Sequence, residues 1–123
     1  MRPFTTLATL GLVGCALGTR SMPSQPTSVW VRSHNKSPVD VYLLCGSNDA
    51  RWLGSVSEKG SEDFEIPAGH LRCAAGLNFF LVVQNANRGY WVGPFSANQG
   101  DMVTLVIEKY AGLSSAQVRY AGL

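Results

Sequence analysis

The chain has 123 residues, a formal net charge of +2, 10% aromatic residues and 15% charged residues. This length suits a single domain with one hydrophobic core, and the composition favours a globular rather than a disordered chain. Because acidic and basic side chains are interspersed and no polybasic run occurs, the charge pattern argues against a nucleic-acid-binding protein.

The N-terminal segment predicts export. Arg2 supplies a positive charge, and residues 4–14 are mostly apolar, contain small residues and carry no charge. About 20 apolar residues are needed to span a bilayer, so this run is too short for a transmembrane helix. Residues 1–14 are therefore predicted to be a signal peptide that is removed.

The sequence Leu12-Val13-Gly14-Cys15 resembles the lipobox of bacterial lipoproteins. The resemblance implies that Cys15 receives a diacylglyceryl group, that cleavage follows, and that the new amine is acylated, usually with palmitate. An ordinary signal peptide containing a cysteine is the alternative. Because Ala16 stands where an inner-membrane retention signal would have Asp, we expect an anchor in the outer membrane, facing either the periplasm or the surface.

Residues 15–28 are predicted to be the lipidated cysteine and a flexible tether, and residues 29–123 to be one β domain. Period-two alternation, interrupted by turn residues about every ten positions, predicts seven or eight short strands. This pattern of short strands favours an antiparallel, immunoglobulin-like β-sandwich, with a small β-barrel as the alternative. Residues 68–76 could form one helical turn or an irregular loop. The predicted strands are Val29–Arg32, Val39–Cys45, Arg51–Val56, Phe64–Ile66, Leu77–Gln84, Tyr90–Phe95 (interrupted at Gly93-Pro94), Met102–Glu108 and Ala116–Tyr120.

Two cysteines remain in the predicted β domain, Cys45 and Cys73. An even pair in an exported protein favours a disulfide, although two buried free thiols are the alternative. The pair lacks a CxxC spacing, and the two histidines are scattered, so no metal site is predicted.

One set of segments covers most of the predicted domain: Val29-Trp30-Val31, Asp40–Leu44, Leu53–Val56, Phe64–Pro67, Gly100–Val103 and Leu105–Ile107. Together they resemble small bacterial lipoproteins with a single β-sandwich, a group whose functions are mostly unassigned. The resemblance implies the fold and the location, and it carries over no active-site residue.

No catalytic motif is evident, and no cofactor is expected. His34 and His70 are the only histidines, and neither has a nucleophile and an orienting carboxylate nearby in the sequence. The sequence therefore predicts a protein that is not an enzyme. A small hydrolase would at least require His70 to meet a serine and a carboxylate in a concave site.

Aromatic side chains are the most suggestive feature of the domain. Trp30, Tyr42, Trp52 and Trp91 fall on predicted strands, where Trp30 and Tyr42 alternate with aliphatic core candidates. They could form an exposed binding face, or the sandwich could bury them.

We therefore expect a non-catalytic protein-interaction or structural module that binds another envelope protein. The partner would dock on the aromatic face or pair with an exposed edge strand, either Val29–Arg32 or Gln117–Tyr120. A module that binds cell-wall glycan through Trp30, Trp52 and Trp91 is the alternative.

Overall fold

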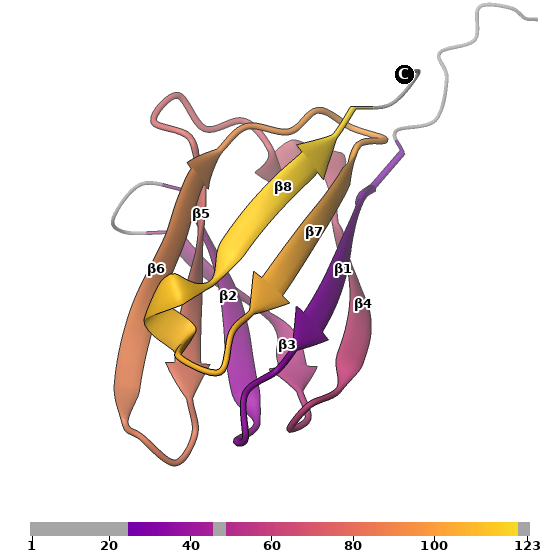
Figure 1. Ribbon diagram of the computed structural model, residues 1–123. Coiled ribbons are helices and arrows are strands. Elements are labelled where there is room, and N and C mark those ends of the chain that lie inside the picture. The colour runs from indigo at the N-terminus through magenta and orange to yellow at the C-terminus, as the bar shows by residue number, and fades with distance from the viewer. Residues whose placement is uncertain (1–24, 46–48, 121–123) are drawn as a thin grey trace, which may run out of the picture.

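The computed structural model describes residues 25–45 and 49–120, which form eight β-strands and two single-turn 3₁₀ helices (Figure 1). Cys15, the predicted signal peptide and most of the tether lie outside the described residues. No helix among the described residues is long and apolar enough to cross a membrane. The elements are β1 (Thr27–Ser33), β2 (Val39–Cys45), β3 (Asp49–Val56), β4 (Ser61–Ile66), η1 (Ala68–His70), β5 (Leu77–Val83), β6 (Arg88–Phe95), β7 (Met102–Ile107), η2 (Ala111–Leu113) and β8 (Ser115–Arg119).

The strands form two four-stranded sheets, with the orders β4-β1-β7-β8 and β3-β2-β5-β6. The sheets pack face to face as two layers (Figure 1), which confirms the predicted sandwich and excludes a closed barrel. All neighbouring strands are antiparallel except β1 and β7, which run parallel from the Ser28–Met102 pair to the Ser33–Ile107 pair. The strands β1 and β7 are therefore neighbours in space, although all four strands of the other sheet lie between them in the sequence.

The core lies between the two sheets and consists of one inward-facing residue at every second position. In β1 the buried residues alternate strictly with exposed ones, and β5 and β7 follow the same period. This alternation arises because successive side chains of a strand point to opposite faces of its sheet. The largest fully buried side chains are Phe79, Ile66, Leu77, Leu81, Leu105, Ile107, Val29, Val31, Val39, Val41, Val56 and Val103.

Several predicted details are corrected by the structure. The strand Val29–Arg32 is confirmed as part of β1, but its predicted place at a sheet edge is wrong, because β1 lies between β4 and β7. The other predicted edge strand, β8, does form an edge. The run Leu77–Val83 is almost continuously apolar, which is typical of a strand covered on both faces. The other sheet covers only the inner face of β5, however, and Phe80 and Val82 on the outer face remain partly exposed.

Three further details concern the turn after β6, the course of β6 itself and the segment 68–76. Asn98–Asp101 forms a turn that carries the chain from β6 in one sheet to β7 in the other, so it does not close a hairpin. The strand β6 continues through Gly93 and Pro94 with a shift in its pairing to β5. Residues 68–70 form the one helical turn, followed by an irregular loop.

Asn35 links three connecting segments at one end of the sandwich. Its side-chain amide donates to the carbonyl oxygens of Glu108 and Lys109, at 3.3 and 3.1 Å, and its Oδ1 accepts a hydrogen bond from the Ser37 backbone at 3.0 Å. Its own carbonyl accepts a hydrogen bond from the Lys59 backbone. Because Asn35 is 93% buried, these hydrogen bonds satisfy polar groups that water cannot reach easily.

Candidate functional site: an aromatic row across one sheet

Four aromatic residues form a continuous row across the outer face of the sheet β3-β2-β5-β6. Tyr42 of β2 is paired directly with Trp52 of β3 on one side and with Phe80 of β5 on the other. Phe80 is in turn paired with Trp91 of β6. Directly paired residues of antiparallel strands point to the same face, so each of the four strands contributes one ring. We call Trp52, Tyr42, Phe80 and Trp91 the aromatic row.

A β-bulge puts Trp52 in this row. The pairing of β2 with β3 shifts between Val41 and Tyr42, so that Val41 is opposite Gly54 while Tyr42 is opposite Trp52, and Leu53 is the extra residue. Leu53 packs against the core. Strict alternation from the buried Val56 would have directed Trp52 inward. The extra residue reverses the alternation and turns the indole outward.

The ring of Phe80 lies over Gly89 of the neighbouring strand. A Cβ added at Gly89 would overlap atoms of the Phe80 ring, so the ring occupies the space that a side chain would otherwise fill. The same ring meets Trp91 edge-on, with centroids 5.3 Å apart and an interplanar angle of 65°. Such edge-to-face pairs are favourable, so the glycine and the tryptophan together set the orientation of Phe80.

The aromatic row borders a shallow apolar hollow of about 330 Å³. Trp52 and Trp91 are the most exposed members of the aromatic row, with 60% and 57% of their surfaces accessible to solvent. The hollow is lined by Tyr42, Leu44, Ala50, Phe80, Val82 and Trp91.

Polar side chains flank the row on the same face. Asp40 precedes Tyr42 by two positions, and its Oδ1 accepts hydrogen bonds from the hydroxyl of Ser55 and from the Gln84 amide, the latter at 3.3 Å. Asn78 precedes Phe80 by two positions on β5. Of the described residues that the strand pairing places on this face, Asp40 alone carries a charge.

The structure brings together three of the four aromatic residues predicted as a binding face. Trp30 is the exception, because β1 belongs to the other sheet, where Trp30 is paired with Asp63 and Thr104 and is 38% exposed. Sequence reasoning missed Phe80. Its place in an unbroken apolar run indicated a fully covered strand and hid the fact that every second residue faces outward.

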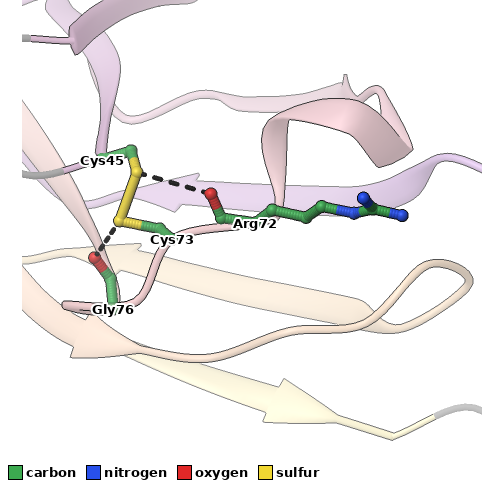
Figure 2. The surroundings of a disulfide bond; sticks show 4 residues. All are labelled: Cys45, Arg72, Cys73 and Gly76. Atoms are coloured by element: carbon green, nitrogen blue, oxygen red, sulfur yellow. Dashed lines mark hydrogen bonds between the residues drawn. A yellow bond between two sulfur atoms is a disulfide. The ribbon is translucent and has the colours of Figure 1, made fainter.

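The structure places Cys45 and Cys73 in position for a disulfide between the end of β2 and the loop before β5 (Figure 2). Their Cα atoms are 5.5 Å apart, within the usual range for a disulfide. The Cys45 sulfur lies 3.7 Å from the carbonyl oxygen of Arg72, and the Cys73 sulfur lies 3.1 Å from that of Gly76 (Figure 2). The bond would tie the loop after η1 to the sheet that carries the aromatic row.

The side chain of neither histidine is hydrogen-bonded to a serine or a carboxylate within residues 25–45 and 49–120. His34 lies just after β1, and its backbone donates to the carbonyl of Ile107. The Nδ1 atom of His70 is buried and has no hydrogen-bond partner, and no serine or carboxylate side chain among residues 25–45 and 49–120 is hydrogen-bonded to this imidazole.

Comparisons with known proteins find a structurally similar chain and no match to a family model or to a curated sequence. No protein-family model matches the chain, and no curated protein matches its sequence. A protein from Eubacterium rectale whose structure was solved by NMR is similar to it, with 10% sequence identity, a TM-score of 0.46, and coverage of 80% of this chain and 93% of that one.

Proposed function

We propose that this protein is a non-catalytic binding module of the bacterial cell envelope. The observation that carries the proposal is the aromatic row, whose two end members, Trp52 and Trp91, are each more than half exposed. Exposed apolar patches on otherwise polar surfaces commonly mark interaction sites, and tryptophan and tyrosine are prominent among residues that dominate binding energy.

The anchor is the second part of this proposal. The lipobox-like sequence Leu12–Cys15 supports attachment through lipid on Cys15, with the outer membrane as the favoured location. Two or three acyl chains on one cysteine hold a protein stably, whereas a single chain holds only marginally. Labelling cells with radioactive palmitate tests this part, and we expect the label to be lost in Cys15→Ser.

Binding is tested by affinity capture with the full chain from solubilised envelope. We expect at least one envelope component, either protein or polysaccharide, to be retained by the wild type and lost in the double variant W52A/W91A. The matched control is Trp30→Ala, which removes a partly exposed tryptophan from the other sheet and should change nothing. If the double variant retains the same components as the wild type, the aromatic row is not a binding site.

A further inference from the structure

We infer that the ligand of the aromatic row is a neutral, unbranched polysaccharide chain that lies across the four strands and stacks its sugar rings on the aromatic side chains. This inference rests on the proposed function and names the class of ligand for the same site. It depends on the shape of the row, on its area and on the polar groups beside it.

The shape of the row matches an extended chain of rings. Neighbouring strands are about 4.8 Å apart, so one aromatic residue on each of four strands gives a row about 14 Å long, roughly the length of three linked sugar rings. The pairing makes the row continuous and perpendicular to the strands. A pyranose ring presents a flat face of C–H groups, which packs on the electron-rich face of an aromatic ring.

The exposed area of the row is small for a protein partner. With roughly 250 Å² for a whole tryptophan, the exposed fractions of Trp52 and Trp91 correspond to about 300 Å² together. Tyr42 and Phe80 are only partly exposed and add less. A stable protein interface needs about 800 Å² from each partner. The two tryptophans supply less than half of that, whereas a short length of glycan can be held on a small apolar surface by a few polar contacts.

The polar groups beside the row suit hydroxyl groups. Asp40, with Gln84 hydrogen-bonded to it, lies along one side of the Tyr42–Phe80 pair, and Asn78 lies along the other. Carboxylate and amide groups can accept hydrogen bonds from sugar hydroxyls, and the amides can also donate. Because Asp40 is the only charged residue among those described on this face, an acidic polymer would meet a like charge and no compensating cation. We therefore expect a neutral sugar chain.

The test measures binding of two neutral probes, cellohexaose and N-acetylchitohexaose, to the full chain in mild detergent, by calorimetry and tryptophan fluorescence. We expect at least one probe to bind, and Trp52→Ala and Trp91→Ala each to weaken binding about five- to tenfold, the loss of one stacked ring. Trp91→Tyr should keep most of the affinity because it keeps a ring. Polygalacturonate, an acidic polymer, should not bind.

Trp30→Ala is the matched control and should bind as the wild type does. Circular dichroism of each variant checks that it is folded, which we expect because Trp52 and Trp91 are exposed. Saccharide binding that Trp30→Ala alone removes would overturn the inference, because the binding would be on the other sheet. No binding of either probe would also overturn it. In that case, an envelope protein captured by the wild type and lost in W52A/W91A would leave the proposed function standing, and no row-dependent capture at all would overturn both.

Discussion

Replacing Asn35 by alanine should be among the most damaging substitutions of a polar residue in this domain. The side chain makes three hydrogen bonds, two to the carbonyls of Glu108 and Lys109 and one from the backbone of Ser37. Each such bond contributes about 1 kcal/mol net, so the free energy of unfolding should fall by about 3 kcal/mol. For a domain of this size the midpoint of thermal unfolding should fall by about 10–20 °C.

Urea unfolding of the full chain, followed by tryptophan fluorescence and circular dichroism, measures the change. The matched control is Asn85→Ala, because Asn85 is exposed and its side chain makes one hydrogen bond, to the hydroxyl of Ser37 at 3.2 Å. Its effect should stay within about 0.5 kcal/mol, as is usual for surface positions.

A second variant separates hydrogen bonding from packing. Asn35→Asp keeps the size of the side chain and the oxygen that accepts from Ser37, but it directs a carboxylate oxygen at the carbonyls of Glu108 and Lys109. We expect it to be at least as destabilising as alanine. If Asn35→Asp is as stable as the wild type, or if Asn35→Ala costs no more than Asn85→Ala, the reasoning about this hydrogen-bonded junction is wrong.

Two further predictions concern the sheet that carries the aromatic row. Gly89→Ala should destabilise the domain by about 1–3 kcal/mol, because its methyl group would occupy the space of the Phe80 ring; urea unfolding measures the loss, and near-ultraviolet circular dichroism should report the displaced Phe80–Trp91 pair. Replacing Cys45 and Cys73 together by alanine should lower the free energy of unfolding by about 3–4 kcal/mol, since the bond closes a loop between residues 28 positions apart. Thiol titration of the denatured, unreduced chain should find neither cysteine free.

Each of these predictions has its own control. Gly69→Ala serves for Gly89, because a Cβ at Gly69 would meet no atom within 4 Å, and it should leave stability nearly unchanged. An equal effect of the two glycine substitutions would show that the loss at Gly89 is not caused by the Phe80 ring. For the disulfide, the wild type treated with reductant should match the double-alanine variant. Two free thiols in the unreduced wild type would disprove the bond.

Much of the sandwich could be predicted from local patterns. Alternation in segments such as Val39–Cys45 and Met102–Ile107 predicted strands that the structure confirms, because one face of each strand is buried and the sequence records that burial residue by residue. Glycine and polar residues stand at the turns that follow β3 and β6, at Glu58–Ser61 and Asn98–Asp101. The number of strands then favoured two packed sheets, which is what the chain forms.

The neighbours of each strand could not be predicted in this way. The sequence placed Val29–Arg32 at an edge, but β1 pairs with both β4 and β7, and the pairing with β7 is parallel. Alternation shows that a strand has an inner and an outer face, and it says nothing about which strand lies beside it. That choice depends on contacts between residues far apart in the chain.

The candidate site likewise combines features that the sequence predicts with features that only the pairing of strands decides. The chain by itself determined that Tyr42 and Trp91 stand on strands and can face away from a core. Only the tertiary structure decided that Trp30 belongs to the opposite sheet, that a bulge at Leu53 turns Trp52 outward, and that Phe80 joins Tyr42 to Trp91. The physical reason is that a row across a sheet is made by the register between strands, and that register is set by long-range packing rather than by any one strand's own sequence.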